Sequence, residues 1–240
     1  MSPVSPPARP HTAVTEDGRR IREVLTYSRR GSRLSDAQAV AWGRRAGRWW
    51  IPDEAVDAAD FSLVSWFGRE APLVVEIGSG IGQATAVLAA THPEHNVLAF
   101  EVWRPGVAET FLELERAGVD NVRLISVDAV WSFSHVIEPG SVAELWTFFP
   151  DPWPKRRHER RRLVTSEFGA VAATRLRTGA LWRLATDIPE YADQMGRVLD
   201  AEPLLEGGRT ERWADRPRTR FECRGVRAGR PSVDLCYRRV

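Results

Sequence analysis

A regular alternation of short apolar runs with helix-like segments begins at residue 73 and constrains the fold more than any other feature of this 240-residue chain. The apolar runs predict strands over 73–77, 96–101, 122–128, 142–149 and 180–187. Helical periodicity follows over 83–90, 105–117, 160–176 and 189–199. Strands that alternate with helices predict an α/β fold, with a mostly parallel sheet and helices on both faces.

The two ends of the chain differ from this pattern. Two strand-like runs, 219–223 and 232–238, follow one another without a helical pattern between them, which is typical of an antiparallel edge. The sequence therefore predicts seven strands with an antiparallel edge strand. Residues 1–25 are proline-rich and poor in apolar side chains, so we expect a disordered tail followed by one domain over 26–240.

Composition excludes several classes of protein. No run of eighteen apolar residues is present, so we expect no membrane-spanning helix and no membrane partner. The N-terminus lacks the apolar stretch of a signal peptide, which favours a cytoplasmic protein. The two cysteines, Cys223 and Cys236, lack C-x-x-C spacing, so neither a disulfide framework nor a cysteine zinc site is expected. We predict no metal, and the sequence does not distinguish a monomer from a homodimer.

Charge is distributed unevenly along the chain. Residues 1–150 carry 14 basic and 19 acidic side chains, a net charge of −5, whereas residues 151–240 carry 20 and 13, a net charge of +7. A basic C-terminal part favours a polyanionic partner, although a solvated mixed-charge surface gives similar sums. All basic residues except Lys155 are arginine, which makes the single lysine inside a motif noteworthy.

A glycine turn follows the first predicted strand, in the sequence V-E-I-G-S-G-I-G over 75–82. Gly78, Gly80 and Gly82 allow a sharp turn and close approach of a ligand. The main alternative is a dinucleotide site, but the third glycine of G-x-G-x-x-G is replaced by Gln83. Glu76 would also repel a pyrophosphate, whereas it suits the cationic amino-acid end of S-adenosylmethionine.

Two further acids end the next two predicted strands. Glu101 lies where an acceptor for both ribose hydroxyls is expected, and Asp128 is placed to accept from the adenine amino group or the ribose edge. Each acid alone could be an ordinary polar residue at a strand end. Three acids at three successive strand ends, with the glycine turn, predict a methyl-donor site for S-adenosylmethionine.

The longest motif, F-P-D-P-W-P-K-R-R-H-E-R-R-R, covers residues 149–162. It begins where the fourth predicted strand ends, at the edge where ligands bind in open α/β sheets. Three prolines restrict its backbone, so Asp151 and Trp153 are expected on a rigid lip, with Trp153 able to stack on a base. The basic residues that follow are predicted to contact RNA phosphates rather than form a solvated helix face: Arg156, Arg157, Arg160, Arg161 and Arg162.

Over roughly 27–240 the chain resembles the bacterial tRNA (guanine-N7-)-methyltransferases. The linked motifs are E-I-G-S-G-I-G, F-E-V-W-R-P-G-V, P-D-P-W-P-K-R-R-H-E-R-R-R, L-A-T-D and R-T-R-F-E-C-R-G. The resemblance implies a Rossmann-like class I methyltransferase that modifies guanine 46 in the tRNA variable loop. It implies that Asp151 is catalytic and lines the donor site with Glu76, Glu101 and Asp128. It also implies that a set of residues contacts the tRNA: Lys155, Asp187, Thr219, Arg220, Phe221 and Glu222.

Ile188, Arg230 and Val233 depart from the family pattern near the expected substrate region. Guanine N7 carries a lone pair at neutral pH, so methyl transfer needs alignment rather than deprotonation. Carboxylates can oppose the charge that develops on the purine and accept from guanine N1–H and the amine. A methyltransferase for another RNA, a protein or a small molecule, or a non-catalytic tRNA-binding homologue, are the alternatives.

Overall fold

The computed structural model describes residues 25–27, 31 and 33–240. The predicted tail therefore lies outside the described residues, except for Leu25, which is buried. Among the helices that the structure describes, each is too short or too polar to cross a lipid bilayer.

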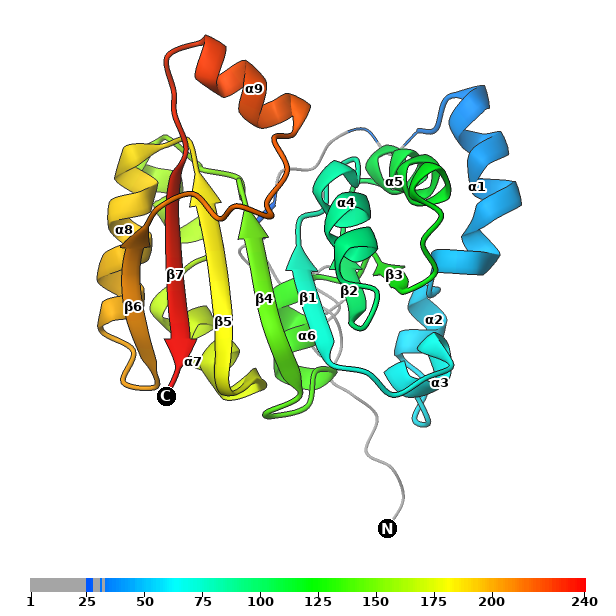
Figure 1. Cartoon of the computed structure of the whole chain (residues 1–240), viewed down its shortest axis with the longest axis horizontal. Helices are drawn as coiled ribbons and strands as arrows, with labels where there is room; N and C mark the ends of the chain where they lie inside the picture. The colour runs from blue at the N-terminus through cyan, green and yellow to red at the C-terminus, as the bar shows by residue number, and fades with distance from the viewer. Residues whose placement is uncertain (1–24, 28–30, 32) are drawn as a thin grey trace, which may run out of the picture.

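Seven strands form one sheet in the order β3-β2-β1-β4-β5-β7-β6 (Figure 1). The bounds are β1 Leu73–Ile77, β2 Asn96–Phe100, β3 Val122–Ile125, β4 Val142–Phe148, β5 Leu176–Thr186, β6 Leu205–Thr210 and β7 Val233–Arg239. Strands β1 to β5 are parallel, and β7 runs antiparallel to both of its neighbours. This confirms the predicted α/β fold class and places the topological switch between β1 and β4.

Helices cover both faces of the sheet (Figure 1). One layer contains α1 (Asp36–Trp49), α4 (Gln83–Thr91) and α5 (Arg104–Ala117). The other contains α6 (Ala129–His135), α7 (Ser166–Arg175) and α8 (Pro189–Asp200). Short helices α2 (Asp53–Val56) and α3 (Leu63–Phe67) precede β1, a 3₁₀ helix η1 spans Arg156–Arg161, and α9 (Arg220–Arg227) lies beyond the carboxyl edge of the parallel strands.

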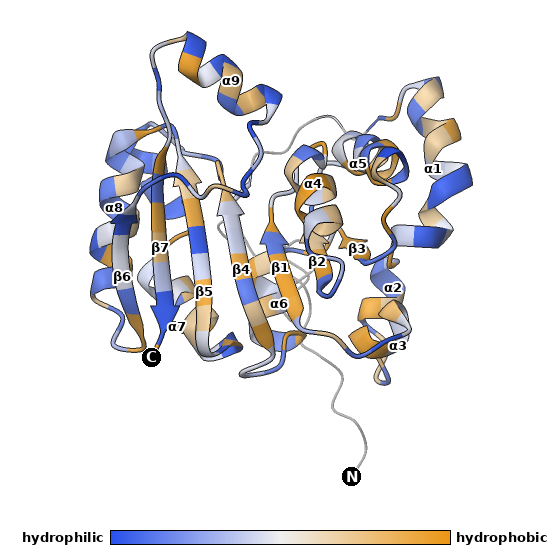
Figure 2. Ribbon diagram, viewed as in Figure 1, coloured by the Kyte–Doolittle hydropathy of each residue, from blue (hydrophilic) through white to orange (hydrophobic). Residues whose placement is uncertain are grey.

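Each layer encloses its own apolar core, because successive side chains of a strand point to opposite faces. In β1, Val75 and Ile77 join the core beneath α6, α7 and α8, whereas Val74 joins the core beneath α4 and α5. Strands β1, β2 and β3 are accordingly apolar along most of their length, whereas β6 is not (Figure 2). Burial on both faces explains why they read as continuous apolar runs in the sequence.

The structure corrects the predicted strand at 219–223, which is the start of α9. Thr219 caps this helix, because its hydroxyl accepts from the Glu222 amide at 3.2 Å. The T-x-x-E spacing of a helix start therefore prevails over the alternating pattern. The strand that completes the seven-stranded sheet is β6 instead. Its Gly207-Gly208 pair gives no strand signal in the sequence. Consequently β6 forms the edge of the sheet, and the antiparallel strand β7 lies one place inside it.

The single helix predicted over 160–176 is also wrong. The segment divides into the end of η1, a buried Leu163-Val164 pair, and α7. Thr165 begins α7 because its hydroxyl accepts from the Phe168 amide. Helix α6, which Asp128 caps, is not predicted by the sequence pattern.

Candidate active site

The glycine turn after β1 forms an open loop at the carboxyl edge of the sheet. Gly78, Gly80 and Gly82 have φ values of 82°, 62° and 76°, in the left-handed region that glycine adopts without strain. A Cβ added at Gly78 or Gly80 would meet no atom within 4 Å, so the loop has space for a ligand on that side. The Gly78 and Ser79 amides donate to the Phe100 carbonyl, which fixes the loop against β2.

Two glycines allow this loop to pack closely against α5. A Cβ added at Gly82 would lie 2.4 Å from Thr110 Cγ2. A Cβ added at Gly106 would lie 2.4 Å from the Gly80 carbonyl oxygen. Gly106 belongs to the F-E-V-W-R-P-G-V motif but was not among the predicted site residues. Its role is to let α5 approach the loop, which only a three-dimensional contact reveals.

Glu76 is buried beneath the loop. The Thr85 hydroxyl donates to Glu76 Oε2 at 2.5 Å. Burial raises the pKa of Glu76 to about 7; the Thr85 hydrogen bond opposes this rise and the charge of Glu101 adds to it. A buried carboxylate with this pKa is suited to a cationic ligand, whose charge would favour the ionised form. Thr85 is a second site residue that sequence reasoning missed.

Glu101 and Asp128 both take part in backbone contacts. The Glu101 carboxylate accepts from the Gly80 amide and from the Trp103 amide, each at 2.7 Å. Because a carboxylate oxygen can accept more than one hydrogen bond, this arrangement is compatible with hydroxyl ligands. Asp128 is buried, and one of its oxygens accepts from the Trp131 amide at 2.9 Å, so it caps α6. Both carboxylates are therefore held in fixed orientations at adjacent strand ends.

The proline motif after β4 forms a pinned lip next to the glycine loop. Phe149 and Trp153 have positive φ angles of 53° and 43°, which side-chain-bearing residues adopt only when their surroundings impose it. Trp153 Nε1 donates to the Thr26 carbonyl, and the Arg161 guanidinium lies 4.2 Å from the centre of its ring. Trp153 is thus held from two sides, as expected for a rigid lip.

Asp151 lies on this lip, half-buried, close enough to α8 for its charge to act on Tyr191. Burial raises the pKa of the Tyr191 hydroxyl, and the charge of Asp151 adds to the rise. Arg162 connects the same two elements: its Nε donates to the Pro152 carbonyl at 2.8 Å and its guanidinium also bonds Gln194 of α8. The lip and α8 therefore share one internal framework.

This contact changes the interpretation of the basic run. Arg162 is only 4% exposed, so it serves the fold rather than an RNA surface, contrary to the prediction. Lys155, Arg156, Arg157 and Arg160 are exposed. Desolvation and the surrounding cations lower the pKa of His158, which disfavours a positive charge on this residue. The exposed members remain candidates for phosphate contact.

Helix α9 brings the remaining predicted residues to the same edge. Phe221 is 46% exposed, and its ring centre lies 5.2 Å from that of Phe149. The Arg220 amide donates to Gln83 Oε1 at the start of α4. Glu222 is buried in ion pairs with Arg212 and Arg216. Glu222 therefore faces cations of this chain in the structure.

Asp187 follows β5 and is also buried against α9. Arg230, one of the departures from the family pattern, donates from Nε to Asp187 Oδ2 at 3.0 Å. Of the other departures, Ile188 caps α8 without a side-chain hydrogen bond and Val233 begins β7. The arginine thus supplies Asp187 with an ion pair.

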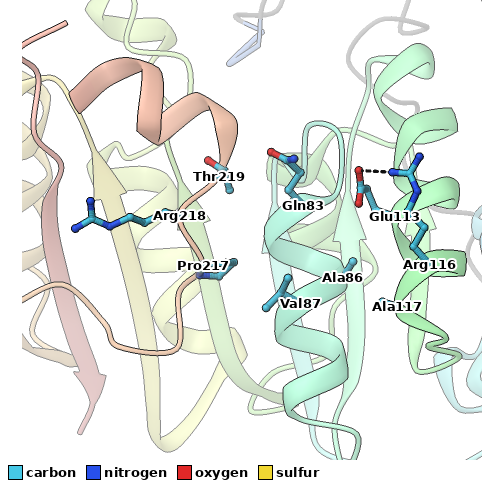
Figure 3. Close-up of a pocket in the computed structure, with 9 residues that line it drawn as sticks. All are labelled: Gln83, Ala86, Val87, Glu113, Arg116, Ala117, Pro217, Arg218 and Thr219. Atoms are coloured by element: carbon cyan, nitrogen blue, oxygen red, sulfur yellow. Dashed lines mark hydrogen bonds and ion pairs between the residues drawn. The ribbon is translucent and has the colours of Figure 1, made fainter. Parts of the chain in front are cut away.

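A pocket of about 330 Å³ lies beside this site rather than in it (Figure 3). It opens between α4, α5 and the segment that leads into α9. The lining residues are Gln83, Ala86, Val87, Glu113, Arg116, Ala117, Pro217, Arg218 and Thr219. Thr219 is the only predicted site residue among them, so this pocket is distinct from the glycine loop.

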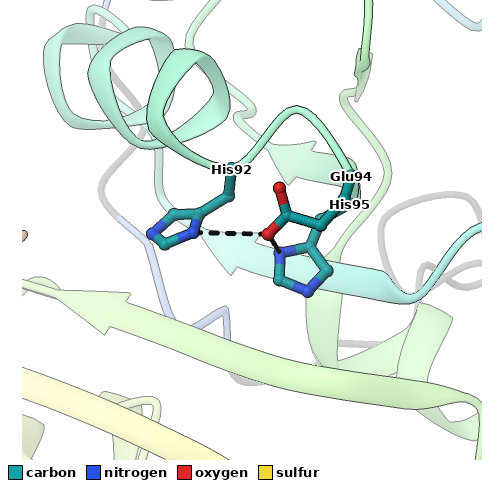
Figure 4. A group of neighbouring side chains, drawn as sticks. All are labelled: His92, Glu94 and His95. Atoms are coloured by element: carbon teal, nitrogen blue, oxygen red, sulfur yellow. Dashed lines mark ion pairs between the residues drawn. The ribbon is translucent and has the colours of Figure 1, made fainter.

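Among the described residues, one group has the side chains of a metal site (Figure 4). Glu94 Oε1 lies 3.5 Å from His92 Nδ1 and 3.4 Å from His95 Nδ1, and His92 Nε2 lies 3.7 Å from Asp215. The group sits between the end of α4 and the start of β2, at the sheet edge opposite the glycine loop. These contacts form a polar cluster away from the donor residues, and the expected absence of a metal stays a prediction.

Comparison with known proteins identifies the family. The model of a family described as "Putative methyltransferase" matches residues 70–235. A protein of Nocardioides sp. named tRNA (guanine-N(7)-)-methyltransferase is 63% identical over 233 residues, which cover 97% of this chain and 94% of that protein. The chain belongs to the tRNA (guanine-N7-)-methyltransferase family. A Cutibacterium acnes member with the same name is 44% identical, over 93% of this chain and 86% of its own length.

A solved structure titled "Structure of an Antibiotic Related Methyltransferase" supports the fold of this family member. It superposes with a TM-score of 0.51 at 13% identity, covering 78% of this chain and 98% of that one. At this identity the likeness concerns the fold alone. The Rossmann-like methyltransferase fold and the family expected from the motifs are therefore both confirmed.

Proposed function

We propose that this chain transfers a methyl group from S-adenosylmethionine to N7 of guanine 46 in the variable loop of tRNA. The names of the relatives support the base and the atom. The donor is supported by the fit of the site: a buried Glu76 for a cationic group, an open glycine loop, and oriented carboxylates of Glu101 and Asp128. The proposal rests mainly on one observation: β1 and β4 are neighbours in the sheet, so the glycine loop after β1 and the lip after β4 lie side by side.

The donor supplies a methyl group on a sulfonium, an electrophile that needs no acid catalyst. Asp151, carried on the pinned lip, would orient the guanine and oppose the positive charge that N7 acquires. No general base is required, because the N7 lone pair is available at neutral pH. The main contribution of the chain is alignment of the nucleophile with the methyl group.

Lys155, Arg156, Arg157 and Arg160 would bind tRNA phosphates next to the lip. All four are exposed and lie in one short segment. Phosphate contacts fix the orientation of a nucleic acid without reading its sequence. Phe221, exposed above Phe149, would offer an aromatic surface to an unstacked base.

The decisive experiment incubates the purified chain with labelled S-adenosylmethionine and unmodified tRNA transcripts, followed by nucleoside analysis. We expect 7-methylguanosine in a transcript with guanine 46 and none when that base is adenine. Label in another nucleoside would contradict the N7 assignment. Label as 7-methylguanosine in both transcripts would contradict the position alone, and donor binding without transfer to any tRNA would favour a non-catalytic homologue.

A further inference from the structure

Helix α9 contacts the site from three sides. Phe221 packs on Phe149 at the start of the lip, and the Arg220 amide bonds Gln83 beside the glycine loop. A Cβ added at Gly225 would lie 3.2 Å from Asp187 Oδ2, so α9 also touches the end of β5. The position of this helix therefore sets how these parts of the site face one another.

A buried arginine outside the helix holds it in place. Arg216 is 2% exposed, and its Nη2 donates to both oxygens of Asp234 in β7, at 2.7 and 3.0 Å. Its Nε donates to the same carboxylate at 3.2 Å. On the other side, Nη1 forms an ion pair with Glu222 of α9 at 3.1 Å. Arg216 thereby links the sheet to the first turn of α9.

The same guanidinium also reaches the lip. Its central carbon lies 5.5 Å from the ring centre of Phe148 and 5.3 Å from that of Phe149. Phe149 is the residue with the left-handed backbone that redirects the chain toward Asp151. One side chain thus contacts the end of β4, the carboxylate of α9 and the carboxylate of β7.

The charges of this cluster balance. Arg212 and Arg216 face Glu222 and Asp234, and the Ser232 hydroxyl donates to Glu222 Oε1 at 3.2 Å. Burial alone would raise the pKa of Glu222, but the Arg212 hydrogen bond and the charge of Arg216 hold it below its ordinary value. A buried ionic network is a poor source of stability compared with apolar packing, whereas it can specify one geometry.

We propose that Arg216 is a positioning residue for guanine methylation, which fixes α9 and the lip relative to each other across the site. The inference rests on the proposed function, because the positions that it sets are those of the guanine and the methyl group. Neither charge nor burial alone requires an arginine here. The requirement is a planar group that hydrogen-bonds Asp234 with two nitrogens while its third nitrogen lies in an ion pair with Glu222.

The test compares Arg216→Lys with the wild type and with Arg209→Lys. The control also removes a guanidinium from an ion pair, but that pair, with Asp193, is exposed and joins β6 to α8. Lysine keeps the charge and cannot bridge both carboxylates in the same way. We expect Arg216→Lys to bind donor and tRNA within about threefold of wild type, but to lose about 10²-fold in the single-turnover rate at saturating tRNA, as for a misaligned reactant.

A purely structural role would lower the melting temperature and leave this rate unchanged below the transition. A folded Arg216→Lys with the wild-type rate would overturn the proposal. If this variant does not fold, Asp234→Asn gives the same test, since it removes the charge and one of the two oxygens that hold Arg216 on β7 while leaving Arg216 and Glu222 in place. A wild-type rate in a folded Asp234→Asn would equally overturn the proposal.

A double-mutant cycle with Glu222→Gln identifies the route of the effect. If Arg216 acts through α9, the double variant should be no slower than the slower single variant, whereas independent losses would multiply and contradict the proposal. Failure of the proposed function is recognised separately. If the proposed function is wrong, the wild type itself forms no 7-methylguanosine in tRNA. If only the role of Arg216 is wrong, the wild type is active and the folded variants match its rate.

Discussion

Donor binding should depend on pH through Glu76. The pKa of this carboxyl is raised from 4.5 to about 7, mainly because it is buried. A cationic amino group binds the ionised form, so the affinity for S-adenosylmethionine should rise as Glu76 loses its proton. At pH 5.5 only about 3% of Glu76 is ionised, against roughly half at pH 7, so the apparent Kd should fall about 16-fold over this interval.

The sign of the stability effect follows from the same shift. Because the folded-state pKa exceeds the unfolded value, the folded chain without donor loses stability as the pH rises from 4.5 to 7. The full effect, roughly 3 kcal/mol at about 1.36 kcal/mol per pKa unit, is present above pH 7. Glu76→Gln should therefore unfold at higher temperature than wild type at pH 8, while binding the donor poorly.

Titration calorimetry from pH 5.5 to 7, in two buffers with different ionisation enthalpies, measures both the affinity and the protons released. The upper limit avoids titration of the donor's own amino group, whose pKa is near 7.7–8.0. Glu101→Gln should move the midpoint to lower pH, since the Glu101 charge contributes to the raised pKa of Glu76. A Kd that is constant over the range, with no proton release, would refute the assignment of Glu76 to the cationic end.

Three further outcomes test the site. Asp151→Ala should fold and bind tRNA but lose about 10²–10³ in rate, with Asp151→Asn retaining more; a destabilised variant with full specific activity would remove Asp151 from the site. Replacing Arg157 and Arg160 by alanine should reduce the steepness of log tRNA affinity against log salt concentration by about 2 and leave donor binding intact. An unchanged slope would contradict phosphate contact. Gly106→Ala should weaken donor binding by distorting the loop at Gly80, so donor affinity equal to wild type would show that the helix yields instead.

The sequence predicts the sheet well, because β1, β2 and β4 are largely buried on both faces and are apolar at most positions. It predicts α9 and β6 less well: the T-x-x-E start of α9 also has the alternating pattern of a strand, and the glycine pair of β6 gives no strand signal. The sequence predicts the positions of Glu76, Glu101 and Asp128 at the carboxyl ends of β1, β2 and β3, and their roles at the donor site stay predictions. Thr85, Gly106 and Arg216 were not found, because each acts through a contact with a residue distant in sequence, and Arg162 was misassigned because a basic run does not reveal which member turns inward.

The strand order has a consequence for synthesis on the ribosome. Among the described strands β6 pairs only with β7, which follows it in the chain yet lies between β5 and β6. Leu205–Thr210 therefore has no ladder partner until residues 233–239 emerge, at a synthesis rate of about 5–20 residues per second. Arg216 also cannot form its hydrogen bonds to Asp234 until β7 is synthesised. The donor half of the sheet can form early, whereas the arrangement of α9 over the site depends on late, long-range pairing, which is intrinsically slow.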